Sequence, residues 1–201
     1  MPMKFSENEK KIIRKIVSYD WSTFCTLDRF IGTKLHFDLI FQPSQKWYLL
    51  YYDIKEGPEG KKERILEFFE LYFLIKRLIK NDLLIIASGD NCDRFVGRQD
   101  FSTTLPGKIV NFKDGSYIDV DYKWKDKDGN IIKDIITFSE TEIPFGEMVC
   151  GLPLISQELK DLVENDFKTE EQRRFQKQQL MTWISIFVAL LIGLLGILCK
   201  H

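Results

Sequence analysis

The stretch that decides the fold is residues 61–81, KKERILEFFELYFLIKRLIKN. One narrow polar stripe at helical spacing holds Glu63, Glu67, Glu70 and Arg77. Apolar side chains cover most of the remaining surface, namely Ile65, Phe68, Phe69, Tyr72, Ile75 and Ile79. A helix this apolar is buried on more than one side. Charged residues interrupt the stretch every few positions, so we expect a core helix and not a membrane span.

The residues before this helix predict two further helices and a strand. Ser6 and Glu9 form a capping box, and apolar residues follow at helical spacing, so a helix over about residues 7–18 is expected. Its other face carries Lys10, Lys11, Arg14 and Lys15, which is typical of a solvated face, with phosphate or anionic lipid as the alternative contact. Residues 21–32, WSTFCTLDRFIG, indicate a short helix that ends at Gly32. Residues 46–54, KWYLLYYDI, predict a strand that runs into a turn at 55–61, KEGPEGK.

The residues after the core helix predict a hairpin. Residues 82–97, DLLIIASGDNCDRFVG, indicate a strand, a polar tip and a return strand. Three helices followed by such a hairpin resemble a winged helix over about 95 residues, without a specific motif and with a strand out of order. The resemblance implies DNA binding, yet the core helix exposes too few basic residues to enter a groove. It therefore serves as a hint about the fold alone.

An alternating pattern in residues 116–124, SYIDVDYKW, predicts a half-buried strand. Its apolar face would hold Ile118, Val120, Tyr122 and Trp124. Asp114-Gly115 and Asp128-Gly129 each favour a tight hairpin turn, and residues 131–138, IIKDIITF, predict a return strand. With residues 107–116, GKIVNFKDGS, these segments predict a small antiparallel sheet of three or four strands.

The C-terminal part predicts a short amphipathic helix and then a long one. Residues 155–167, ISQELKDLVENDF, place Leu159, Leu162, Val163 and Phe167 on one side. A second helix is expected to begin at the capping box TEEQ, 169–172, and to continue unbroken to Cys199. Residues 180–199 carry no charge and, as a helix, match the hydrocarbon thickness of a bilayer. A buried core helix is the alternative, but it would show a polar stripe, so we expect a transmembrane tail anchor.

The flanks of the expected span predict its orientation. The basic residues before it are Lys168, Arg173, Arg174 and Lys177, and only Lys200 and His201 follow it. The positive-inside rule therefore places the N-terminal part in the cytoplasm, and Trp183 is expected at the membrane interface. The N-terminus lacks the apolar run of a signal peptide, so the cysteines are expected as thiols. We favour a bacterial inner membrane over a eukaryotic organelle membrane.

Small residues in the span suggest a contact face. Ser185, Ala189 and Gly193 recur every four residues, with Gly196 close by, and would let two helix backbones approach closely. Small residues are also common in membrane helices without any such role. The expected partners are therefore the lipid bilayer and either a second copy of the chain or another membrane protein.

The sequence as a whole predicts an α+β chain in four parts. A helical domain with a strand hairpin would occupy residues 1–100, and a small antiparallel β subdomain residues 101–155. An amphipathic stalk helix at 156–179 would then continue into the transmembrane helix at 180–201.

No motif predicts catalysis, a cofactor or a metal. The chain lacks a P-loop, a Rossmann glycine pattern, G-x-S-x-G and H-E-x-x-H. Cys25 with His36 would suit a Cys–His nucleophile, but a structural histidine near a buried thiol is the simpler interpretation. The Asp-rich stretches 89–93, GDNCD, and 126–130, DKDGN, are better explained as turns than as calcium loops. A formal net charge of −1 argues against nucleic acid as a partner.

Three functions remain open at this point. The first is a non-catalytic cytoplasmic sensing or docking domain held at the bilayer, which self-associates through the transmembrane helix. The second is a membrane-acting effector, in which a trigger sensed by the soluble part makes the tails cluster and perturb the bilayer. The third is a membrane-anchored regulator with winged-helix-like DNA binding, which the weak charge disfavours. An enzyme whose reaction no motif names is a further alternative.

Overall fold

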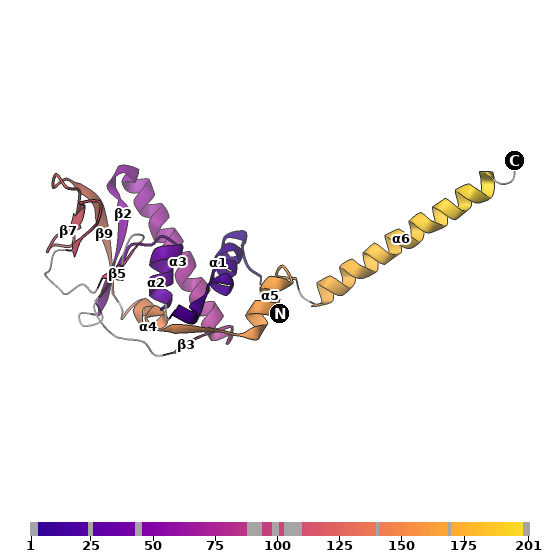
Figure 1. The fold of residues 1–201 in the computed structure, drawn as a ribbon, viewed down its shortest axis with the longest axis horizontal. Helices are drawn as coiled ribbons and strands as arrows, with labels where there is room; N and C mark the ends of the chain where they lie inside the picture. Colours follow the sequence, from indigo (N-terminus) through magenta and orange to yellow (C-terminus); the bar gives the residue numbers. More distant parts are fainter. Residues whose placement is uncertain are drawn as a thin grey trace.

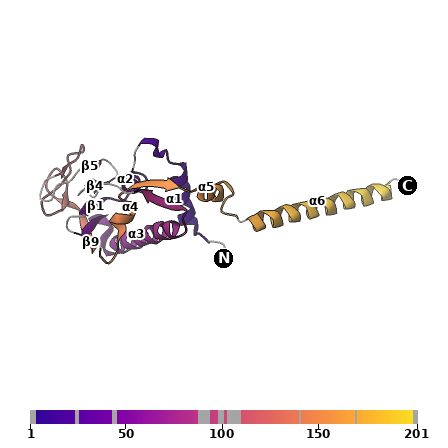
Figure 2. The same ribbon diagram turned by 90° about the horizontal axis from the view of Figure 1, so that it is seen from below.

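The computed structural model describes residues 4–23, 26–42, 46–87, 94–97, 101–102, 110–139, 141–168 and 170–198. The described residues up to residue 168 form a head of mixed helices and strands. One long helix, α6 (Glu170–Leu198), extends away from the head in both views (Figures 1 and 2).

The head is built around an eight-stranded antiparallel sheet, in the order β5-β4-β1-β2-β9-β8-β7-β6. Its strands are β1 (Leu39–Gln42), β2 (Trp47–Asp53), β4 (Arg94–Val96), β5 (Phe101–Ser102), β6 (Val110–Asn111), β7 (Tyr117–Ile118), β8 (Trp124–Lys125) and β9 (Ile131–Ser139). The longest pairing joins β2 to β9, from Trp47 opposite Ser139 to Asp53 opposite Lys133. A separate two-stranded sheet pairs β3 (Leu84–Ala87) with β10 (Leu152–Ile155).

The central strands are buried on both faces. Successive side chains of a strand point to opposite faces, so β1 and β2 contribute to two cores. Phe41 and Tyr48 belong to the core on the helical side, whereas Ile40 and Tyr51 belong to the other. The segment from β6 to β8 supplies Phe112, Ile118 and Trp124 to the second core. The sheet is curled, so that these short strands cover its second face.

Five α-helices of the head and two 3₁₀ turns complete the described elements. They are α1 (Glu7–Ser18), α2 (Leu27–Lys34), α3 (Gly57–Lys80), α4 (Phe145–Val149), α5 (Gln157–Glu164), η1 (Trp21–Thr23) and η3 (Ile54–Glu56). Helix α3 is the predicted core helix, and that prediction is confirmed. Its Phe68 is fully buried, with its ring centroid 4.8 Å from that of Phe145 and 5.0 Å from that of Phe138.

Several local predictions are confirmed. The capping box of α1 is present, since the Ser6 hydroxyl accepts from the Glu9 amide and the Glu9 carboxylate accepts from the Ser6 amide. Strand β2 forms where the aromatic segment predicted it. Both Asp-Gly turns form, and Gly115 and Gly129 each have a φ of 84°, which glycine adopts without steric cost. The predicted turn at 55–61 instead contains η3 and the first residues of α3.

The predicted hairpin over residues 82–97 is wrong. Strand β3 pairs with β10, and β4 pairs with β1 in the large sheet. The expected polar tip, residues 88–93, lies outside the described residues. The wing that carried the winged-helix resemblance is therefore missing, because its two strands belong to different sheets.

The single strand expected over residues 116–124 is also wrong. Strand β7 ends at Ile118 and β8 begins at Trp124, with a turn between them in which Tyr122 has a φ of 61°. The Asp119 carboxylate stabilises this turn by accepting from the amides of Asp121 and Lys123, at 3.0 and 2.8 Å. The predicted small antiparallel sheet is thus a hairpin series within the eight-stranded sheet.

The C-terminal helices are partly as predicted. Helix α5 forms, and the Ser156 hydroxyl caps it by accepting from the Leu159 amide at 3.1 Å. Helix α5 ends at Glu164 and α6 begins at Glu170, so residues 156–179 are not one stalk helix. Thr169, the first residue of the expected capping box, lies outside the described residues.

Candidate functional site

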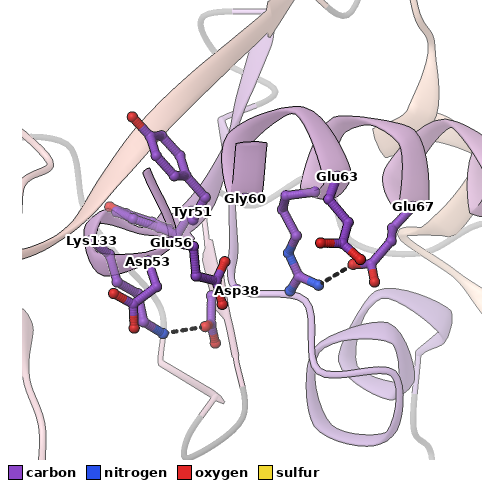
Figure 3. A pocket seen from close by; sticks show the side chains of 10 residues that line it. Asp38, Tyr51, Asp53, Glu56, Gly60, Glu63, Glu67 and Lys133 are labelled. Carbon is purple, nitrogen blue, oxygen red and sulfur yellow. Dashed lines mark hydrogen bonds and ion pairs between the residues drawn. The ribbon is translucent and has the colours of Figure 1, made fainter. Parts of the chain in front are cut away.

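A pocket of about 280 Å³ opens where β1 begins, β2 ends and α3 starts (Figure 3). Sheet residues form one wall, and the first turns of α3 form the other. The lining residues are Asp38, Tyr51, Tyr52, Asp53, Glu56, Gly60, Glu63, Arg64, Glu67 and Lys133. The pocket therefore combines carboxylates, two cationic side chains and two phenols.

A buried ion pair lies in the sheet wall. Asp38 is only 2% exposed, and its Oδ2 lies 2.5 Å from Nζ of Lys133 on β9. Figure 3 shows the two side chains pointing toward one another. The Lys133 ammonium also lies 4.0 Å from the ring centroid of Trp124. A Cβ atom at position 97 would come within 2.7 Å of Asp38 Oδ1, so Gly97 leaves room for this carboxylate.

Tyr51 is a fixed, neutral group beside this pair. Its hydroxyl donates to the carbonyl of Tyr122 at 2.8 Å, and its own amide donates to the carbonyl of Asp38 at 3.0 Å. Burial raises the pKa of Tyr51, and the charges of Asp119 and Asp38 raise it further. The phenol therefore stays protonated over the physiological pH range.

The helical wall is fixed by Arg64. Its Nη1 lies 2.8 Å from Oε2 of Glu67, and its Nη2 donates to the His36 carbonyl at 2.5 Å. The guanidinium also lies over the ring of Phe37, at 4.2 Å from the centroid. His36 itself has a φ of 62°, which turns its carbonyl toward this helix. Arg64 is therefore committed to local contacts.

The pocket carries a surplus of negative charge. Its five carboxylates and two cationic side chains give a formal charge of −3. Both cations are paired with carboxylates of the pocket, as described above. Among the described residues, no ion pair involves Asp53, Glu56 or Glu63. No group of three or more potential ligands is placed to hold a metal ion within the described residues.

Sequence reasoning did not single out this pocket. Asp38 and Lys133 are 95 positions apart, and no local pattern joins them. One signal was present: Asp38 lies within HFDLIF, where a carboxylate among apolar residues requires a partner on burial. The sequence identified Glu63 and Glu67 only as members of a polar stripe.

The residues predicted from sequence to act at the membrane lie on or just before α6. Trp183, Ser185 and Ala189 are exposed, and the Ser185 hydroxyl donates to the Met181 carbonyl of its own helix at 2.9 Å. Gly193 and Gly196 belong to the same helix. Arg173, Arg174 and Lys177 occupy its first turns, and Lys168 precedes it. All of these residues except Lys168 share one helix, and none of them lines the pocket.

Helix α6 is long and apolar enough to cross a membrane. Among the described residues it is the one helix that meets this condition, over the 21 residues Gln172–Ile192. Every side chain in that range is exposed. A continuous apolar surface is formed by Trp183, Ile184, Ile186, Phe187 and Leu190.

The other residues considered from sequence form no catalytic group that the structure describes. Cys25, Cys92, Cys199 and His201 lie outside the described residues, so the Cys25–His36 pair is not placed. Cys150 is buried in the core on the helical side. Residues 126–130 form the predicted turn, in which Asp126 accepts from the amides of Asp128 and Asn130 at 2.9 and 2.8 Å. A side-chain hydrogen bond from Asn130 lowers the pKa of Asp126.

Comparison of the chain with protein-family models, with curated proteins and with solved structures finds no match.

Proposed function

We propose that this chain is a single-pass membrane protein whose head is a non-catalytic sensing or docking domain held at the bilayer surface. The exposure of α6 is the observation that supports this most. Apolar surface left in water costs about 25 cal/mol per Å², and the apolar side chains of α6 are exposed as far as Ile192. A bilayer would remove that cost, because its hydrocarbon core matches the length of such a helix.

The proposed orientation places the head in the cytoplasm. Arg173, Arg174 and Lys177 precede the apolar part of α6 and suit the cytoplasmic headgroup region. The polar first turns of α6 would then keep the head close to the lipid. We favour the bacterial inner membrane as the location.

We propose that the pocket of the head senses a solute. Its formal charge of −3 favours a small molecule that carries a positive charge, such as an organic amine. The carboxylates of Asp53, Glu56 and Glu63 would contact the ammonium group. Tyr51 and the Asp38–Lys133 pair would form a preorganised wall.

Membrane extraction tests the anchor. Membranes from cells that express the full chain are washed with alkaline carbonate and then with detergent. We expect the chain to resist carbonate and to dissolve in detergent. Recovery of unaggregated full-length chain in the supernatant without detergent would refute the proposal. Protease treatment of inverted vesicles tests the orientation, since digestion of the head is expected only when the cytoplasmic face is outside.

A membrane-acting effector is the second candidate function. It is favoured by the small residues of α6, because Ser185 and Ala189 are exposed and Gly193 follows at the same spacing. Replacing Ala189 and Gly193 with Ile should weaken self-association in a membrane two-hybrid assay. Dye entry into expressing cells that depends on α6 would favour the effector. Intact cells with a self-associating chain would favour the docking domain.

A further inference from the structure

The junction between α5 and α6, residues 165–168, has an unusual backbone. The Asp166 amide donates to the Val163 carbonyl and the Phe167 amide to the Leu162 carbonyl, at 3.0 and 2.8 Å. These two bonds form a Schellman motif, in which the residue after the cap is normally glycine. Here Asp166 has a φ of 52° and Phe167 a φ of 59°. Left-handed conformations are costly for such residues and persist only where surrounding contacts hold them.

Helix α1 supplies those contacts. Arg14 Nη2 lies 2.7 Å from Asp166 Oδ1, and the Arg14 guanidinium lies 5.2 Å from the ring centroid of Phe167. The Lys10 ammonium lies 5.8 Å from the same ring. Phe5, just before α1, meets Phe167 edge to face with centroids 5.7 Å apart. Figure 1 shows α1 beside α5, near the start of α6.

The N-terminal part of α1 and the preceding Phe5 are fixed to the core helix. Arg77 of α3 lies 2.6 Å from the Glu9 carboxylate and 4.6 Å from the ring centroid of Phe5. The Asn8 amide donates to the Glu70 carboxylate of α3 at 2.7 Å. Helix α1 therefore contacts α3 on one side and the junction on the other.

The ion pair between α1 and the junction is on the surface, whereas Phe167 is half-buried and packs against the core. The Arg14 and Asp166 side chains are 42% and 66% exposed, so water and salt screen their ion pair. The cost of the positive φ at Asp166 and Phe167 acts against these contacts. From residue 157 to residue 192 the sequence contains neither glycine nor proline, so it does not prevent one continuous helix.

We propose that α1 is a latch that keeps α5 and α6 as two separate helices, and that its release lets the junction become helical and join them. Release would remove the two left-handed residues and turn α5 and α6 into a single stalk. The head would then move relative to α6 without unfolding. If α6 is the membrane helix of the proposed function, the latch sets how the head sits on the bilayer.

Distance measurement between α5 and α6 tests the latch. Nitroxide labels are placed at Lys160→Cys and Gln179→Cys in full-length chain in detergent, with the four native cysteines replaced by serine. One continuous helix would put these Cα atoms about 29 Å apart. We expect the distance distribution of the parent chain to lack a population at about 29 Å. The variant Arg14→Ala with Asp166→Ala should gain a population at about 29 Å, because it lacks the ion pair and alanine favours a helix.

A matched variant separates the latch from simple loss of an ion pair. Arg14→Ala with Asp166→Gly removes the same ion pair, but glycine tolerates the positive φ and disfavours the helix. Its population at about 29 Å should be smaller than in the alanine variant by at least about fivefold. Lys11→Ala, on the exposed face of α1, should leave the parent distribution unchanged.

Three results would overturn the latch. They are a parent chain already at about 29 Å, an alanine variant identical to the parent, and equal populations in the alanine and glycine variants. The measurement is made in detergent and does not depend on membrane extraction. Failure of the anchor and failure of the latch are therefore distinguishable.

Discussion

Helices α3 and α6 are both long and rich in Leu, Ile and Phe, yet they have opposite surroundings. In α3, Phe68, Leu71 and Leu74 are completely buried. In α6, every side chain from Gln172 to Ile192 is exposed. Charged residues recur throughout α3, whereas residues 180–198 of α6 have none. Apolar content therefore does not separate a core helix from a candidate membrane helix, but the distribution of charge does.

The partner surfaces of the two helices differ as well. Helix α3 packs against rings from distant parts of the chain, such as Tyr48 of β2 and Phe138 of β9. Within the described residues, α6 buries no side chain between positions 172 and 192. Under the proposed function, lipid covers the apolar surface of α6, as the sheet covers the apolar surface of α3.

Truncation of the α3 core should give the largest effect on the stability of the head. Phe68→Ala removes a fully buried ring that contacts Tyr48, Phe138 and Phe145, and should lower the free energy of unfolding by about 3–5 kcal/mol. Leu66→Ala on the same helix is the control, because Leu66 is 60% exposed and its loss should cost less than about 0.5 kcal/mol. Urea unfolding of the full chain in detergent measures both. Similar losses for the two variants would contradict the assignment of α3 as the core helix.

A charge in α6 should affect the membrane and leave the head intact. Leu190→Arg places a guanidinium in the middle of the uncharged run, residues 180–199, at a cost of about 2.5–3.5 kcal/mol for insertion. Less chain should then resist carbonate extraction, while Leu190→Ala should behave like the parent. The urea midpoint of the head should not change. A shifted midpoint with unchanged extraction would show that α6 belongs to the head and would reverse the comparison with α3.

Loss of the pocket ion pair should have an intermediate effect. Lys133→Met leaves the buried Asp38 carboxylate without its ammonium partner, and should cost about 1–3 kcal/mol of stability. The added change Asp38→Asn removes the uncompensated charge and should recover part of that loss. A double-mutant cycle by urea unfolding measures the coupling. Purely additive losses would indicate that the two side chains do not stabilise one another.

Sequence predicted the elements that local signals define. The capping box placed α1, the polar stripe placed α3, and the Asp-Gly pairs placed two hairpin turns. The long uncharged run identified α6 as a candidate span. In each case the residues that decide the structure are neighbours in the chain, so one window of sequence contains the whole signal.

Sequence failed where the partner is distant. Strand β3 has an ordinary strand sequence, but nothing in it distinguishes a hairpin with β4 from the observed pairing with β10. Val120 continued the alternation of its neighbours, yet the Asp119 side chain closes a turn there and leaves Val120 51% exposed. The pocket was missed for the same reason, because Asp38 and Lys133 meet only after β2 pairs with β9.

Removal of one buried hydroxyl should have the smallest effect, and pH makes it visible. Tyr51→Phe loses the hydrogen bond to the Tyr122 carbonyl, worth about 1 kcal/mol at neutral pH. Burial, Asp119 and Asp38 raise the pKa of Tyr51 above its ordinary value of 10.0. Above pH 10 the unfolded chain therefore loses this proton before the folded chain does. The stabilisation is complete below that pH and decreases as pH rises.

The pH profile of Tyr51→Phe should therefore be flatter than that of the parent. Urea unfolding from pH 8 to pH 11 should show a shallower loss of stability above pH 10 for the variant, because phenylalanine has no proton to lose. Tyr52→Phe is the matched control: burial and a hydrogen bond to Asp134 also raise the pKa of Tyr52, but this side chain is more exposed than Tyr51. Its profile should stay closer to that of the parent. Equal slopes for the parent and Tyr51→Phe would mean that Tyr51 ionises as readily in the folded head as in the unfolded chain. The second core would then be open to water, unlike the core in which α3 is buried.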